Sequence, residues 1–110
     1  MAVMNELNSA NFDSEVLQSP TPTLVYFISP WCGPCKTLNP IVTELAEEWS
    51  ERLRVGTLDI YENFGMTMCY AILKAPTLML FVNGQAVERV TGFASKQSLK
   101  LRFAPHLGLE

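Results

Sequence analysis

The sequence is poor in several features that would point to particular classes of protein. Cysteine occurs only three times in 110 residues, too rarely for a small secreted scaffold held together by disulfides. Charged residues make up 17%, below the usual quarter, which excludes disorder of the whole chain. Eight basic residues stand against eleven acidic ones, a net charge of −3. We therefore expect no nucleic-acid partner and no anionic membrane partner, both of which need a basic patch.

Long apolar runs are also missing. The longest covers six residues, Met68–Leu73, far fewer than a helix needs to cross a bilayer. Residues 1–11 contain neither a basic segment nor a continuous apolar stretch, so they do not resemble a signal peptide. We expect a cytoplasmic protein in a reducing compartment; an organelle reached with a transit peptide that is later removed is also compatible with the sequence.

Apolar residues, in contrast, are plentiful. They make up 48% of the chain, enough for the core of a single domain spanning residues 1–110. Residues 24–28 form a continuous apolar run, which predicts a strand covered on both faces and central in its sheet. Residues 53–60 and 77–82 predict two further strands. Asn83-Gly84 is a preferred hairpin turn, so residues 85–91 should return antiparallel as an edge strand.

Helical periodicity separates these strands. One apolar face with a 3.6-residue period predicts the longest helix: Leu38, Ile41, Val42, Leu45, Ala46 and Trp49. Pro40 lies inside this pattern and should kink the helix without ending it. Ser9 is the expected cap of a short first helix and Ser95 that of the last, while residues 62–70 predict a short, less regular helix. This alternation predicts an α/β fold, a mixed sheet with helices on both faces.

The segment with the clearest chemistry is Trp31-Cys32-Gly33-Pro34-Cys35-Lys36, between the central strand and the long helix. Cys32 is expected to stand exposed at the turn, where the unpaired N–H groups and the positive end of the helix favour its thiolate. Cys35 should lie one turn further in and be more buried. Two unequal thiols suit a two-step exchange, in which one attacks a disulfide and the other resolves it.

Three interpretations of this cysteine pair compete. A structural disulfide would constrain little, because loop-closure stabilisation grows with the size of the ring. A zinc site needs four ligands, and Cys69 and His106 are the remaining thiol and imidazole, without a second closely spaced pair. The position at the start of a helix favours the third interpretation, a redox dithiol.

The six-residue segment resembles the active-site signature of the thioredoxin family, and the similarity covers nearly the whole chain. Further matching positions are Pro40, Ala75-Pro76-Thr77, Phe81, Asn83-Gly84 and Gly92. The resemblance implies the thioredoxin fold, a central mixed five-stranded sheet flanked by four helices, with a cis peptide bond before Pro76. It also implies a protein-disulfide reductase that serves electron transport and cell redox homeostasis.

The resemblance further implies how such a protein works. Cys32 and Cys35 are the catalytic thiols: Cys32 attacks, Cys35 resolves, and a thioredoxin reductase, NADPH- or ferredoxin-linked, restores the dithiol. The other partners are disulfide-containing client proteins. We expect a monomer without metal and without a cofactor other than the redox-active Cys32–Cys35 disulfide. The alternative is a thioredoxin-fold binding module that acts as a partner in a complex without redox turnover.

Clients should bind around the dithiol. The expected substrate-binding residues are Trp31, Gly33, Pro34, Ala75, Pro76 and Gly92. The backbone of Ala75 could pair with an extended client segment as an added strand. Trp31 is expected at the surface. Other aromatic side chains, for which packing in the core is an open alternative, are Tyr61, Phe64, Tyr70 and Phe93.

Three positions near the motif depart from the family pattern. Many thioredoxins pair a buried aspartate in the central strand with a lysine on its neighbour, whereas this sequence has Tyr26 and Thr57 there. Losing both charges together leaves no uncompensated charge in the core. We expect the Tyr26 hydroxyl to bond to a local partner such as Thr57. Without a carboxylate base, Cys35 should resolve the mixed disulfide with the help of water or the leaving thiolate. Ile28 stands where many relatives have a second tryptophan.

The third thiol, Cys69, is expected to be a small half-buried side chain in the third helix. A regulatory thiol open to oxidation is the alternative. His106 is expected to be an ordinary surface residue.

Overall fold

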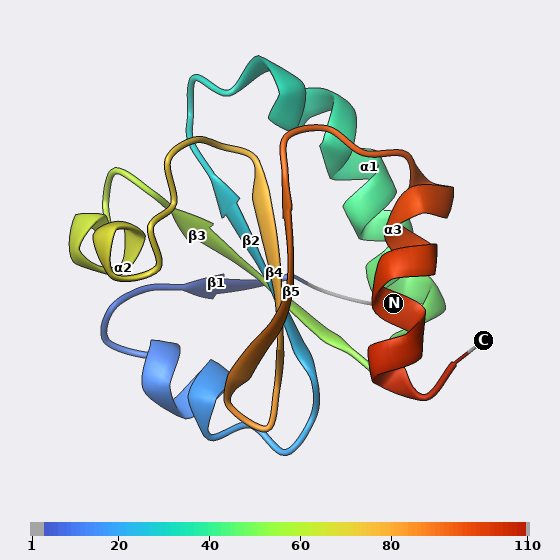
Figure 1. Ribbon diagram of the computed structural model, residues 1–110. Helices are drawn as coiled ribbons and strands as arrows, with labels where there is room; N and C mark the ends of the chain where they lie inside the picture. Colours follow the sequence, from blue (N-terminus) through green and yellow to red (C-terminus); the bar gives the residue numbers. More distant parts are fainter. Residues whose placement is uncertain (1–3, 110) are drawn as a thin grey trace.

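The computed structural model describes residues 4–109, and a mixed sheet lies at its centre (Figure 1). The strands are β1 (Asn5–Leu7), β2 (Thr23–Ile28), β3 (Arg54–Asp59), β4 (Thr77–Val82) and β5 (Gln85–Thr91). The helices are η1 (Asp13–Leu17, a π-helix), α1 (Gly33–Glu48), α2 (Phe64–Cys69), α3 (Lys96–Phe103) and η2 (Ala104–Leu107, a 3₁₀-helix).

Within the described residues the sheet has five strands in the order β1-β3-β2-β4-β5. β2 is the central strand, parallel to β3 and antiparallel to β4. Residues 23–27 of this strand are all buried, as the continuous apolar run predicted. β4 and β5 form the predicted hairpin, and φ is positive at both turn residues, 53° at Asn83 and 79° at Gly84.

The two faces of the sheet carry separate cores, because successive side chains of a strand point to opposite sides. Leu24 and Tyr26 of β2 pack with α1 and α3 on one face. Val25 and Phe27 pack on the other face, in the same cluster as Phe12 and Val16 from the η1 segment. Figure 1 shows α1 and α3 together on one side of the sheet and η1 and α2 on the other.

The long helix α1 begins directly after Cys32 and carries the predicted apolar face. It continues through Pro40, whose side chain is exposed, so the proline removes a backbone donor without disturbing the core. Trp49 caps its C-terminal end and is buried. At the other predicted cap, Oγ of Ser95 accepts a hydrogen bond from the N–H of Ser98 at 3.2 Å.

The N-terminal segment differs from the prediction in two ways. β1 was not predicted, because it has three residues and buries only Leu7. The prediction of Ser9 as a helix cap is wrong. Instead, Oδ1 of Asn8 accepts the N–H groups of Ala10 and Asn11 at 2.8 and 3.0 Å. The N–H of Ser9 donates to Oδ1 of Asn63, 3.0 Å away, and so ties this turn to the segment before α2.

No helix within residues 4–109 is both long enough and apolar enough to span a membrane.

Candidate active site

Three connections meet at one end of the sheet, at the row Phe27–Thr77–Thr91. Phe27 near the end of β2 pairs with Thr77 at the start of β4, and Thr77 pairs with Thr91 at the end of β5. The segment after β2, the segment before β4 and the segment after β5 therefore leave the sheet side by side. Figure 1 shows these three connections at the same end of the molecule. They carry the cysteine motif, Ala75-Pro76 and Gly92.

Cys32 and Cys35 form a disulfide, with their Cα atoms 5.2 Å apart. Cys32 is the N-cap of α1, and its Sγ accepts a hydrogen bond from the backbone N–H of Cys35 at 3.0 Å. Pro34 lies in the first turn of the helix, where its missing N–H costs no helical bond. The Cys32 sulfur is therefore held at the positive end of α1.

The expectation that Cys32 stands exposed is wrong for this disulfide form. Its exposed fraction is 8%, close to the 5% of Cys35. The reason is that the bond to Cys35 and the hydrogen bond from the Cys35 N–H both turn the Cys32 sulfur toward the helix. The two cysteines differ in position along α1 and hardly at all in burial.

The side chain next to the disulfide is open to solvent. Trp31 is 78% exposed, as predicted, and its ring meets that of Tyr61 edge to face with centroids 5.3 Å apart. Phe64 and Phe93 are also exposed, so for these two, and for Tyr61, packing in the core is ruled out. Tyr70 instead lies half-buried against Phe12 and Phe81 in the second core.

Beside the motif the surface is hollowed. A hollow of about 390 Å³ is lined by Gly33, Pro34, Thr37 and Phe93. The Ala75–Pro76 peptide bond is cis, as the resemblance implied. The N–H of Gly92 donates to the carbonyl of Pro76 at 2.8 Å, which joins the two connections. Gly92 has a φ of +86°, a conformation that other residues rarely adopt.

Tyr26 lies beneath the motif and is 1% exposed. Its hydroxyl donates toward Oδ1 of Asn39 at 2.6 Å and toward the carbonyl of Cys35 at 3.2 Å. The prediction that Thr57 is the partner of the Tyr26 hydroxyl is therefore wrong. Although Tyr26 and Thr57 are neighbours in the β2–β3 register, the long tyrosine side chain reaches past the sheet to α1. Burial raises the pKa of the Tyr26 hydroxyl to about 12, so it stays protonated at neutral pH.

The remaining thiol and imidazole lie elsewhere. Cys69 ends α2 and is exposed, so the expectation of a half-buried thiol is wrong; this short helix buries only Thr67. His106 is a surface residue, as expected, with its Nε2 3.8 Å from a carboxylate oxygen of Glu88. Within residues 4–109 no three His, Cys, Asp or Glu side chains gather where they could hold a metal ion.

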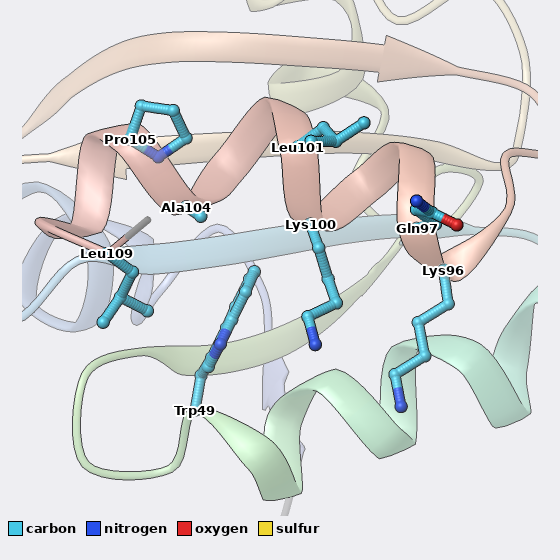
Figure 2. Close-up of a pocket in the computed structure, with 8 residues that line it drawn as sticks. All are labelled: Trp49, Lys96, Gln97, Lys100, Leu101, Ala104, Pro105 and Leu109. Atoms are coloured by element: carbon cyan, nitrogen blue, oxygen red, sulfur yellow. The ribbon is translucent and has the colours of Figure 1, made fainter.

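A larger hollow, of about 790 Å³, lies between the C-terminal end of α1 and the last helices, and contains none of the predicted site residues (Figure 2). Figure 2 shows Lys96 and Lys100 reaching from α3 toward α1. Both ammonium groups are paired with Glu48, and Lys96 also with Glu44. Both lysines that line this hollow are thus already paired with glutamates and do not form a site for an anion.

Two residues of the site, Thr37 and Asn39, were not predicted from the sequence. Both lie on α1, at polar positions outside its apolar face. A signal for Asn39 existed, because residues four apart on a helix share a face and Asn39 follows Cys35 by four. Nothing in the sequence indicated that Tyr26 would reach this face.

Known proteins resemble this chain over most of its length. The family model described as Thioredoxin matches residues 3–104. Thioredoxin 1 of Synechococcus elongatus is 39% identical over 107 residues, which cover 97% of this chain and 100% of the relative. Thioredoxin of Buchnera aphidicola is 42% identical over 95 residues, covering 86% of this chain and 88% of the relative. Thioredoxin of Rickettsia felis is 40% identical over 95 residues, covering 86% and 90%.

These matches agree with the fold and with the chemistry that the site offers. The mixed sheet, the bonded cysteine pair at the start of α1 and the cis-proline connection are all present in one chain. The chain belongs to the thioredoxin family and is a thiol–disulfide oxidoreductase that reduces protein disulfides.

Proposed function

We propose that the two cysteines have different roles, Cys32 as the attacking thiol and Cys35 as the resolving thiol. The observation that carries this proposal is the N-cap geometry: the Cys32 sulfur accepts the Cys35 N–H and lies at the positive end of α1. Both features stabilise negative charge on Cys32. Cys35 lies within the first turn of the helix, where its own backbone N–H points back at Cys32.

The exchange has two balanced steps. The Cys32 thiolate attacks one sulfur of the client disulfide; a Cys32–client bond forms, and the other client sulfur leaves as a thiolate. Cys35 then loses its proton to water or to that thiolate and attacks the Cys32 sulfur. The Cys32–Cys35 bond forms, the second client sulfur leaves, and the client has gained two electrons.

We propose that clients bind across the three connections at the end of the sheet. The proposed contacts are Trp31, Gly33, Pro34, Ala75, Pro76 and Gly92. Support comes from the exposed Trp31 ring and from the hollow lined by Gly33, Pro34, Thr37 and Phe93. An extended client segment would pair with the backbone of Ala75, which lies two residues before the start of β4 at this end of the sheet.

Membership in the family implies a thioredoxin reductase and client proteins as partners. We further propose that the reductase is NADPH- or ferredoxin-linked, and that residues 1–110 act as a single domain, as a monomer, in the cytoplasm. Both cores include side chains of the same central sheet, which supports the proposal of a single domain. A cytoplasmic location would suit this activity, because thiols are kept reduced in the cytosol and disulfides there are transient and catalytic.

The test of the two roles is the reduction of a protein disulfide, such as those of insulin, with dithiothreitol as the electron donor. Wild type should accelerate the reaction, Cys32→Ser should not, and Cys35→Ser should accumulate a mixed disulfide through Cys32 that mass spectrometry identifies. Cys69→Ser is the matched control and should behave as wild type. Equal rates for wild type and Cys32→Ser would favour the binding module instead, and a mixed disulfide through Cys69 would contradict the assigned roles.

A further inference from the structure

The Tyr26 hydroxyl links the central strand to the backbone of Cys35. The hydroxyl is buried, and both of its acceptors, the Cys35 carbonyl and Oδ1 of Asn39, belong to α1. The two acceptors lie four residues apart, hence on one face of the helix. One hydroxyl of β2 therefore touches the helical turn that begins with Cys35 and ends with Asn39.

This turn lies at a weak point of the helix. Pro40 has no N–H, so the carbonyl of Lys36 has no helical donor four residues on. The hydroxyl of Tyr26 supplies a bond from outside the helix to the carbonyl of the preceding residue, Cys35. It thus ties the first turn of α1 to the sheet next to the position where the helix has lost one of its own bonds.

We propose that Tyr26 is a positioning residue for the exchange. Its hydroxyl, which bonds to both the Cys35 carbonyl and Asn39, holds the Cys35 backbone in place while the Cys32–Cys35 disulfide is open. This inference rests on the roles proposed above for the two cysteines. In the disulfide form the covalent bond itself holds the turn. In the mixed disulfide and in the dithiol that bond is absent, and the contact with Tyr26 keeps Cys35 within reach of Cys32.

The physical effect is on the entropy of ring closure. A turn that is already ordered loses less conformational freedom when Cys35 attacks Cys32, so the effective concentration of the Cys35 thiol is higher. Removing the hydroxyl should slow the resolving step and make the disulfide less favourable relative to the dithiol. A single hydrogen bond contributes a factor of about two to ten in such an equilibrium.

The role is one of position and not of proton transfer. The single hydrogen of the hydroxyl is shared between two acceptor oxygens, and the hydroxyl, with its pKa raised by burial to about 12, remains protonated. A protonated phenol cannot accept the proton of Cys35. The Cys35 proton therefore leaves to water or to the departing thiolate, as in the two steps above.

The test follows the two steps separately with an aromatic disulfide, dithiobis(nitrobenzoate), in the reduced full-length chain carrying Cys69→Ala. Attack by Cys32 forms a Cys32–aryl disulfide and releases one thionitrobenzoate, in a phase whose rate rises with reagent concentration. Attack by Cys35 forms the Cys32–Cys35 bond and releases the second, in a phase independent of reagent concentration. The equilibrium constant for formation of the Cys32–Cys35 disulfide by exchange with oxidised glutathione, called the glutathione constant below, is measured on the same variants.

Tyr26→Phe removes only the hydroxyl. It should slow the second phase and lower the glutathione constant for disulfide formation, each by about two- to tenfold, and leave the first phase unchanged. Asn39→Ala should have a smaller effect, because the Cys35 carbonyl still receives the hydroxyl. Tyr70→Phe is the matched control: it removes a tyrosine hydroxyl in the second core and should change neither quantity.

The inference is overturned if Tyr26→Phe and Tyr70→Phe give the same second phase and the same glutathione constant. A variant that loses thermal stability but keeps both quantities would show that Tyr26 serves the fold alone, which also contradicts the inference. Failure of the underlying roles gives a different result: a chain with tyrosine at position 26 would then release no second thionitrobenzoate in a concentration-independent phase.

Discussion

The backbone N–H of Cys35 points at the sulfur of Cys32, 3.0 Å away, so the first cysteine of the motif caps the helix by accepting a hydrogen bond from the second. When the disulfide is reduced, the same N–H can donate to a thiolate at Cys32. Cys69 provides an internal comparison, because it is exposed and ends a helix instead of beginning one.

We therefore expect Cys32 in the reduced chain to react with iodoacetamide faster than Cys69 at neutral and mildly acid pH. The reason is that the N-terminal end of α1 stabilises a thiolate, while the C-terminal end of α2 does not. Peptide mapping by mass spectrometry after short labelling times measures both rates in one sample. Faster labelling of Cys69 across this pH range would contradict the assignment of Cys32 as the attacking thiol.

A second prediction concerns the packing of β1 on β3. A Cβ atom at Gly56 would lie 2.5 Å from Cδ1 of the buried Leu7 side chain. Gly56→Ala should therefore lower the free energy of unfolding by about 1–3 kcal/mol, the usual cost of overpacking a core. Urea denaturation followed by circular dichroism measures the change.

The control for this change is Gly65→Ala, since a Cβ at Gly65 of α2 would meet no atom within 4 Å. Its stability should be unchanged or higher by up to about 1 kcal/mol, because glycine costs a helix that much relative to alanine. If the two variants were equally stable, the close approach of Leu7 to Gly56 would be wrong.

Alkaline pH should destabilise the fold through Tyr26. Burial raises its pKa from 10.0 in the unfolded chain to about 12, so the folded state resists ionisation. A raised pKa means that this stabilisation is fully present below pH 10.0 and is lost as the pH rises toward about 12. Tyr26→Phe should therefore show a smaller decrease in the free energy of unfolding between these two pH values than wild type. A decrease as steep in the variant would show that other groups control alkaline unfolding.

Acid pH should act through Glu48 in α1. Hydrogen bonds from Lys96 and then Lys100 hold the pKa of this carboxyl below its usual value. A lowered pKa means that its contribution is present above the unfolded pKa and is lost as the pH falls through the folded one. Glu48→Gln should be less stable than wild type at neutral pH, and the difference should shrink as the pH falls below the usual pKa of a glutamate carboxyl. Urea denaturation over a series of acid pH values measures this, with Glu47→Gln on the same helix as the control that should show no such convergence.

Local patterns in the sequence were sufficient to predict most of the helices and strands. The apolar run of residues 24–28 predicted the central strand, the 3.6-residue period predicted α1 through Pro40, and Asn83-Gly84 predicted the β4–β5 turn. β1 escaped prediction, since a strand of three residues with one buried side chain leaves too little pattern. Its place at the edge depends on pairing with β3, far along the chain.

For the site, too, local features were predicted and long-range contacts were not. Spacing and the helix start were enough to identify Cys32 and Cys35 as a reactive pair, because their chemistry depends on neighbours in the sequence. The burial of Cys32 depends on the disulfide form, and the partner of Tyr26 depends on segments that meet only after folding. For both, and for the exposure of Cys69, the prediction from the sequence was wrong.

The sequence by itself thus determined the kind of chemistry, whereas the tertiary structure decided its surroundings. A dithiol at a helix start is a local feature, set by backbone N–H groups a few residues away. Which hydroxyl reaches Cys35 is a long-range feature: Tyr26 and Asn39 are 13 residues apart and lie on a strand and a helix. Only the packing of α1 against β2 brings their side chains within 2.6 Å, because a buried hydroxyl takes the nearest acceptor that the folded chain offers.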